Sequence, residues 1–151
     1  MIYLASDHAG YELKNQIVEY VKELGYAVTD MGPKEYDPED DYPDFIIPAA
    51  EKVAEKKDNL GIIFGGSGQG EGLAANKVRG IRAVVYYGFE PTIVKLSKEH
   101  NNANVLSIGA RFVSVKDAKR SVKLWLDTKF SNAVRHKRRL KKVSDYEQRA
   151  E

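Results

Sequence analysis

The stretch LGIIFGGSGQGEG, residues 60 to 72, decides the fold. Leu60 to Phe64 are apolar throughout, which is typical of a strand buried on both faces of a parallel sheet. Glycine then fills five of the eight positions from 65 to 72, and a helix is predicted to begin near Glu71. A strand, a glycine-rich turn and a helix in this order are the elements of an α/β protein.

The same alternation continues on both sides of this stretch. Strands are predicted at 2–6, 27–30, 60–64, 82–87 and 105–108. Helices are predicted at 12–24, 44–56, from about 71, 91–99, 115–126 and 132–148, and 32–42 is a predicted loop. Right-handed crossovers between parallel strands place helices on both faces of the sheet. The predicted fold is therefore a three-layer α/β/α sandwich around a five-stranded parallel sheet.

Length and composition favour one globular domain that spans residues 1–151. Hydrophobic residues make up 42% of the chain and charged residues 30%, and the net charge is only +2, so neither long disorder nor general nucleic-acid binding is indicated. The absence of cysteine excludes disulfides, thiolate metal sites and a cysteine nucleophile or base. No apolar run approaches the roughly 18 residues of a membrane span. We find no signal peptide, so we expect a cytoplasmic protein.

The residues with chemical potential follow the predicted strands. Ligands of open α/β sheets bind outside the carboxyl ends of the strands. Ser6-Asp7-His8 follows the first strand, Gly65 to Gly70 the third, and Gly109-Ala110-Arg111 the fifth. In contrast, His100-Asn101-Asn102 is predicted in the loop before the fifth strand, at the opposite edge of the sheet.

The glycine-rich turn suits an anion, because its N–H groups can point inward and the following helix adds its positive dipole end. It is no P-loop, since Glu71 follows Gly70 where Lys is required, and it does not fit a dinucleotide fingerprint. Glu71 would repel a bound phosphate, yet it would serve as a base beside a developing oxyanion. The alternative is a first-turn glutamate that only stabilises the helix dipole.

Other candidates also have two interpretations. Asp7-His8 is either a ligand contact or a turn with a helix cap, and His100 is either a proton donor or a surface histidine. The basic run 135–142 places Arg135, Arg138, Arg139 and Lys142 on one helical face. Arginines there could bind phosphate through paired hydrogen bonds, or the face could simply be solvated.

Several segments together resemble one family. They are SDHAG at 6–10, DYP at 41–43, GSGQGE at 66–71, AANK at 74–77, GIRA at 80–83, EHNNAN at 99–104, IGAR at 108–111 and RHKRR at 135–139. In this order, from residue 6 to about 148, they resemble the ribose-5-phosphate isomerase B family, which includes the galactose-6-phosphate isomerases. The resemblance implies a Rossmann-like sandwich that needs no metal and no cofactor.

The resemblance also implies shared active sites in a homodimer or a dimer of dimers. The helix at about 132–148 would pack on the partner subunit. By resemblance, Asp7 and His8 contact the sugar, Asn101 contacts the substrate, and His100, assisted by Asp7, opens the sugar ring. The backbone of Gly66, Ser67, Gly68, Gln69 and Gly70 forms the anion hole, and Arg111, Arg135 and Arg139 bind the phosphate. In the mechanism that we expect, Ser67 also assists proton movement between O1 and O2.

One departure from the family pattern is informative. Many members carry a cysteine base just before the Gly-(Ser/Thr)-Gly turn, where this chain has Gly65. Another branch of the family uses a glutamate at the position of Glu71, and this sequence resembles that branch. The resemblance thus makes Glu71 the expected catalytic base.

The expected activity is the interconversion of ribose 5-phosphate and ribulose 5-phosphate through a cis-enediolate. One alternative substrate is a six-carbon aldose phosphate such as allose or galactose 6-phosphate. A second alternative is a non-catalytic sugar-phosphate or nucleotide-binding regulator on the same fold. A third, RNA binding by the basic helix, is disfavoured because no aromatic platform accompanies that helix. The expected ligand is a sugar phosphate, with neither nucleic acid nor membrane as a partner.

Overall fold

A computed structural model describes residues 1–149. Its centre is a sheet of five parallel strands in the order β2-β1-β3-β5-β4. The strands are β1 (Ile2–Ser6), β2 (Val28–Asp30), β3 (Leu60–Gly65), β4 (Ala83–Tyr86) and β5 (Val105–Gly109). The strand order reverses after β2, so that β1 and β3 are neighbours. Folds of this kind bind ligands at the carboxyl ends of the two strands where the order reverses.

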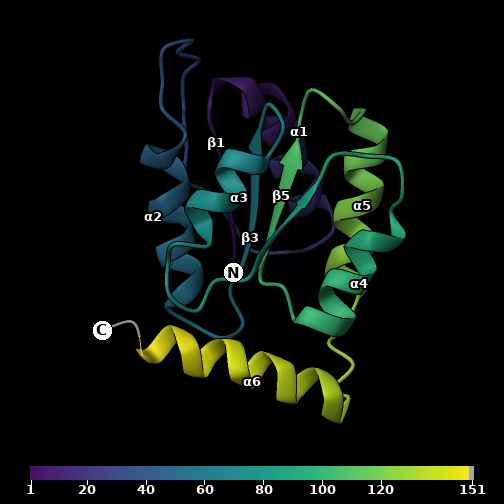
Figure 1. Cartoon of the computed structure of the whole chain (residues 1–151). Coiled ribbons are helices and arrows are strands. Elements are labelled where there is room, and N and C mark those ends of the chain that lie inside the picture. The colour runs from purple at the N-terminus through teal and green to yellow at the C-terminus, as the bar shows by residue number, and fades with distance from the viewer. Residues whose placement is uncertain (150–151) are drawn as a thin grey trace.

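Helices cover both faces of the sheet (Figure 1). They are α1 (Tyr11–Glu23), α2 (Pro43–Ala54), α3 (Gln69–Ala75), α4 (Thr92–Asn101), α5 (Val115–Asp127) and α6 (Val134–Arg149), with a short 3₁₀ helix η1 (His8–Gly10) before α1. On one face, α1, α4 and α5 pack on the sheet, and on the other face α2 and α3 do so. The predicted three-layer sandwich is confirmed.

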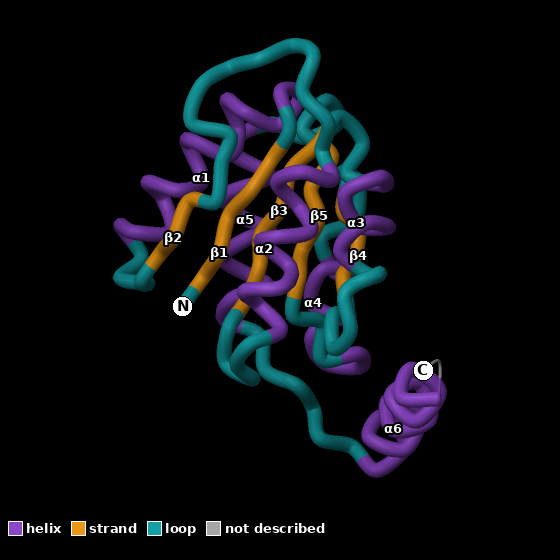
Figure 2. The backbone as a smooth tube through the Cα atoms, turned by 90° about the vertical axis from the view of Figure 1, so that its left-hand side faces the viewer, coloured by secondary structure: helices purple, strands orange, loops and turns teal. Residues whose placement is uncertain are grey.

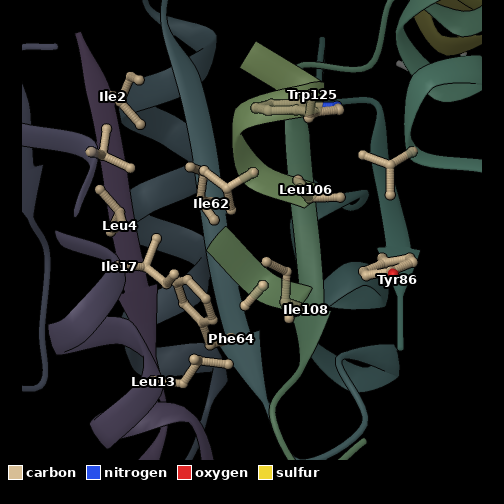
Figure 3. Close-up of a cluster of buried hydrophobic side chains, with 14 of the residues drawn as sticks. Ile2, Leu4, Leu13, Ile17, Ile62, Phe64, Tyr86, Leu106, Ile108 and Trp125 are labelled. Atoms are coloured by element: carbon tan, nitrogen blue, oxygen red, sulfur yellow. The ribbon is translucent and has the colours of Figure 1, made fainter. Parts of the chain in front are cut away.

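Alternation along β3 produces two separate cores. Ile62 and Phe64 point into the core beneath α1 and α5, whereas Ile63 points into the core beneath α2 and α3. Figure 3 shows the first of these cores, with Trp125 of α5 lying near Ile62 and Leu106. A strand that is buried on both faces explains the apolar run at residues 60–64.

Several predicted boundaries were wrong by a few residues, and two of these errors concern the site. Gly65 is the last residue of β3 rather than part of the turn, and α3 begins at Gln69 instead of near Glu71. His100 and Asn101 form the last turn of α4 and are not in a loop, because the helix continues until Asn102 adopts a left-handed conformation with a φ of 47°.

Helix α6 lies beyond the amino ends of the strands (Figure 2) and meets the rest of the chain at few points, among them the ring of His100 and the N–H of Gly80. Its one buried residue within the described part of the chain is His136. Its basic side chains, including Arg135 and Arg139, are exposed. No helix within residues 1–149 is long and apolar enough to cross a membrane.

Candidate active site

The carboxyl ends of β1 and β3 bring together two acidic side chains. Asp7 follows β1, is buried, and caps η1 by accepting a hydrogen bond from the N–H of Gly10 at 3.2 Å. Glu71 lies in the first turn of α3 and is only 4% exposed. The capping interpretation of Asp7 is therefore confirmed. The expectation of a merely dipole-stabilising glutamate does not explain why the carboxylate is buried.

Glu71 occupies the place that a side chain at residue 65 would take. A Cβ atom built on Gly65 would coincide with the carboxyl group of Glu71. This position therefore has to be glycine while Glu71 keeps its conformation. In many members of the family that the sequence resembles, a cysteine stands at the position of Gly65. The Glu71 carboxylate thus lies where the side chain of that cysteine would begin.

Burial raises the pKa of the Glu71 carboxyl above its ordinary value, and the nearby charge of Asp7 raises it further. Desolvation disfavours the charged form of an acid, and a like charge does the same. A carboxylate with a raised pKa is a better proton acceptor near neutral pH than an exposed one. Glu71 therefore has the burial and the electrostatic surroundings of a general base.

The glycine-rich turn is fixed by the end of β5. The N–H groups of Ala110 and Arg111 donate to the carbonyls of Gly65 and Gly66 at 2.8 and 3.0 Å. The hydroxyl of Ser107 donates to the carbonyl of Gly68 at 2.6 Å. Gly68 has a φ of 76°, a left-handed conformation that favours glycine.

With its carbonyls held in this way, the turn keeps N–H groups available. No acceptor within residues 1–149 binds the N–H groups of Ser67, Gly68 and Gly70. The hydroxyl of Ser67 accepts from the N–H of Gln69 at 3.3 Å. Free amides at the start of a helix, beside a buried carboxylate, form a place where a developing oxyanion can be stabilised.

His8 and Arg111 lie at the border of this turn. The guanidinium of Arg111 lies beside Gly66, since a Cβ atom on that glycine would be 3.1 Å from Nη1. Arg111 is also close enough to His8 to act on its pKa. The structure therefore brings Asp7, His8, Ser67, Glu71 and Arg111 together, and we call these residues the carboxyl-edge cluster.

Two neighbours of this cluster were not singled out by sequence reasoning. Asp40 accepts hydrogen bonds through Oδ1 from the backbone N–H of His8 at 3.0 Å and pairs with its Nδ1 at 2.7 Å. This hydrogen bond raises the pKa of the His8 imidazole. The ring of Tyr42 lies against Gly70, because a Cβ atom there would be 3.0 Å from the Tyr42 Cζ. Only the DYP segment in the family resemblance pointed to this loop.

Asp7, His8 and Asp40 could also hold a cation. One ligand atom from each lies within 4.8 Å of the others. However, the Nδ1 atom of His8 is already engaged by Asp40. The expectation that no metal is needed therefore stays a prediction.

The remaining predicted residues lie elsewhere. His100 and Asn101 line a hollow of about 200 Å³ between β4 and α4. The ring of His100 lies 4.3 Å from that of His136, which α6 contributes. We call His100, Asn101, Arg135 and Arg139 the amino-edge cluster. A five-residue strand such as β5 spans roughly 17 Å, so a single subunit does not bring the two clusters together.

The fold and the carboxyl-edge cluster define an α/β enzyme of the class that moves protons beside a stabilised oxyanion. Comparison with known proteins identifies the particular family. The model of the family described as Ribose/Galactose Isomerase matches residues 2–143, and the chain belongs to this family.

Individual relatives agree with this assignment. Ribose-5-phosphate isomerase B of Mycolicibacterium paratuberculosis is 44% identical over 146 residues, which cover 97% of this chain and 91% of the relative. A crystal structure of ribose-5-phosphate isomerase B from Mycoplasma genitalium, with bound ribulose-5-phosphate, superposes with a TM-score of 0.93 at 40% identity and covers 97% of this chain and 95% of that one. The enzyme from Clostridium thermocellum gives 0.93 at 39% identity, with 99% of both chains covered.

Proposed function

We propose that this protein is an aldose–ketose isomerase that interconverts ribose 5-phosphate and ribulose 5-phosphate. The observation that carries the proposal is the buried Glu71 carboxylate, which lies above Gly65 and beside the free amides of the turn. A protein that only bound sugar phosphates would not need a buried base there. The relatives named above are isomerases of the same sugar phosphates.

The reaction requires that one proton be moved between neighbouring carbons. Glu71 removes the proton from C2 of the open-chain aldose and returns it to C1. The free N–H groups of the turn, those of Ser67, Gly68 and Gly70, stabilise the negative charge of the cis-enediolate, which exists only during the reaction. Ser67 assists the transfer of a proton between O1 and O2.

Before this step the furanose ring has to open. His100 transfers the protons for ring opening with help from Asp7, while His8 and Asn101 contact the sugar. Arg111, Arg135 and Arg139 hold the phosphate and so fix the sugar relative to Glu71. This assignment needs residues from both clusters at one substrate, and those clusters lie at opposite edges of one subunit.

A homodimer with shared sites resolves this separation. The edge strand β4 is flanked by exposed apolar side chains from α3, α4 and the loops that follow β4 and β5: Leu73, Tyr87, Phe89, Ile93, Leu96 and Phe112. An apolar surface of this kind favours association. His100 and Asn101 line the adjoining hollow together with Ile93 and Leu96. In this proposal, α6 packs on the partner and delivers Arg135 and Arg139 to its site.

The test is a product assay. The purified protein is incubated with ribose 5-phosphate, and ribulose 5-phosphate is measured over time. A panel that adds allose 6-phosphate and galactose 6-phosphate decides between five-carbon and six-carbon substrates. We expect ribose 5-phosphate to be isomerised with the highest kcat/KM of the panel. In the cell, we propose that the reaction takes place in the cytoplasm, as part of the pentose phosphate pathway. Binding without turnover of any aldose phosphate would instead favour a sugar-phosphate-binding protein.

A further inference from the structure

A groove of about 690 Å³ lies at the amino edge of the sheet, away from the carboxyl-edge cluster. Its walls come from the loops around Ile81, Ala103 and Phe130 and from the inner face of α6, including Leu140 and Val143. Helix α6 crosses this edge in Figure 1. The volume is in the range of pockets that hold metabolites.

The groove is lined by more cations than anions. Five lining side chains are cationic and two are acidic: Lys57, Arg82, Lys98, Lys129 and Lys141 against Asp58 and Glu147. Lys141 already pairs with Asp145 at 2.7 Å. The carboxylate of Glu147 accepts a hydrogen bond from the N–H of Gly80 at 3.0 Å and partly offsets the charge of Arg82.

Lys98 is the unusual member of this set. Its side chain is 8% exposed, and its amine lies 4.2 Å from the centre of the Trp125 ring. Within residues 1–149, no carboxylate and no hydrogen-bond acceptor binds this amine. Burial lowers the pKa of the Lys98 amine to about 8, and the charge of Arg82 adds to the effect. A buried cation without an anionic partner is destabilising.

Arg82 is held in a fixed orientation beside Lys98. Its Nε donates to the carbonyl of Asn102 at 2.8 Å and its Nη1 to that of Gly80 at 3.3 Å. Its Nη2 donates no hydrogen bond within the described part of the chain. The groove thus offers an oriented guanidinium and a mostly buried amine, neither of which forms an ion pair within the described residues.

We propose that this groove is a second anion site, which binds a phosphate group on Lys98 and Arg82. Charge-assisted hydrogen bonds from an amine and a guanidinium suit the oxygens of a phosphate. The apolar wall formed by Ile81, Phe130 and Leu140 would contact the carbon part of a phosphate monoester. This site does not include the glycine-rich turn or the exposed arginines of α6, and it can exist whether or not the proposed reaction is correct.

The experiment uses the fluorescence of Trp125, the one tryptophan in the sequence (Figure 3). The full-length protein is titrated with inorganic phosphate at pH 7 and constant ionic strength. A saturable change in emission is expected, because the anion would contact the amine that lies over the ring. Lys98→Met should raise the midpoint by about tenfold or more, and Lys98→Arg should keep it close to that of the wild type.

Arg139→Ala serves as the control for phosphate bound at the sugar-phosphate site. The emission change should persist in this variant with an unchanged midpoint. A parallel titration with ribose 5-phosphate separates the two sources of phosphate. A midpoint lower than that of inorganic phosphate shows that the apolar wall contacts the carbon part of the monoester. An equal or higher midpoint shows a site for free phosphate. Either result supports the anion site.

Three results would overturn the inference. They are a linear, non-saturable emission change, an unchanged midpoint in Lys98→Met, and loss of the response in Arg139→Ala. Should Lys98→Met fail to fold, ¹H–¹⁵N NMR of the wild type decides. Phosphate-induced shifts must then include the indole N–H of Trp125 and the amides of residues 80–82 and 102–104. Shifts confined to the glycine-rich turn and the amino end of α6 would refute the second site.

Discussion

The carboxyl-edge cluster and the amino-edge cluster differ in how their surroundings fix them. Glu71 and Asp7 are buried, and the turn beside them is tied to β5 by backbone hydrogen bonds. Arg135 and Arg139, in contrast, are exposed on a helix that buries only His136 within the described residues. The first cluster is organised within one subunit. Within the described residues of one subunit, the arginines of the second cluster have no such environment, which is why we propose shared sites.

The largest expected effect is that of Glu71→Gln, which tests whether the organised cluster contains the base. Loss of a general base typically lowers the rate by about 10²–10⁴-fold, so kcat should fall at least that far while inhibition by inorganic phosphate stays nearly unchanged. Substantial residual kcat in the pure variant would show that another group is the base.

The same variant tests the electrostatics of the site by its pH profile. Because the pKa of Glu71 is raised, kcat/KM of the wild type should fall with decreasing pH through a midpoint above 4.5, the ordinary carboxyl value. The base is lost when it is protonated, which sets the sign. This acid limb should disappear from any residual activity of the variant.

Gly65→Ala tests the close approach between the turn and the base. The new methyl group would coincide with the Glu71 carboxyl, so the side chain must leave its position, and most of the activity should be lost. Overpacking of this kind typically destabilises a protein by about 1–3 kcal/mol. The matched control is Gly65→Ala combined with Glu71→Ala, which should unfold at a higher denaturant concentration than Gly65→Ala alone. Equal stability of the two variants would mean that the clash is absent.

The sequence predicted the organised cluster better than the surface that completes it. Local patterns were sufficient for the strands, for the glycine-rich turn and for Glu71 as a candidate. The predicted end of α4, at residue 99, was wrong. The helix continues to Asn101 because Asn102 caps it in the left-handed conformation, which Asn adopts less often than Gly. Asp40 was missed because its contact with His8 joins residues 32 positions apart. Asp40 lies in the acidic loop 32–42, and the sequence of that loop does not distinguish it from an ordinary solvated loop.

A mixing experiment tests whether the two clusters meet across subunits. Glu71→Gln and His100→Asn are each expected to be nearly inactive. If sites are shared, a mixed dimer carries both changes in one site and none in the other. Random reassociation of equal amounts makes half of the dimers mixed, so about a quarter of the wild-type activity should return. Activity no higher than that of the separate variants, despite subunit exchange shown by mass spectrometry, would place each site within one subunit.

Arg139→Ala has a smaller expected effect and uses Arg138→Ala as its matched control. Both arginines are exposed on α6, but only Arg139 is assigned to the phosphate. Loss of a charge-assisted contact should raise KM by roughly tenfold or more with little change in kcat. Arg138→Ala should keep KM near the wild-type value. An equal rise in both variants would indicate general electrostatic attraction by α6 instead of a specific contact.

Asp40→Asn is expected to have the smallest effect, and it refines the description of the organised cluster. Asp40 holds the Nδ1 side of His8, so the Nε2 atom remains available to a sugar hydroxyl. The hydrogen bond that Asp40 accepts from the His8 ring raises the pKa of His8, and an amide in place of the carboxylate should lower that pKa toward 6.5, its ordinary value. With three histidines in the chain, NMR can follow the His8 ring as an individual signal.

The sign of the linked stability follows from the same shift. A raised histidine pKa stabilises the folded state at pH values below the unfolded pKa, and this contribution is lost as the pH rises through the folded pKa. Asp40→Asn should therefore lose more stability at pH 5 than at pH 8, as measured by urea unfolding, while kcat/KM falls only a few-fold. An unchanged His8 titration midpoint, or an equal loss of stability at both pH values, would mean that Asp40 only supports the backbone N–H of His8.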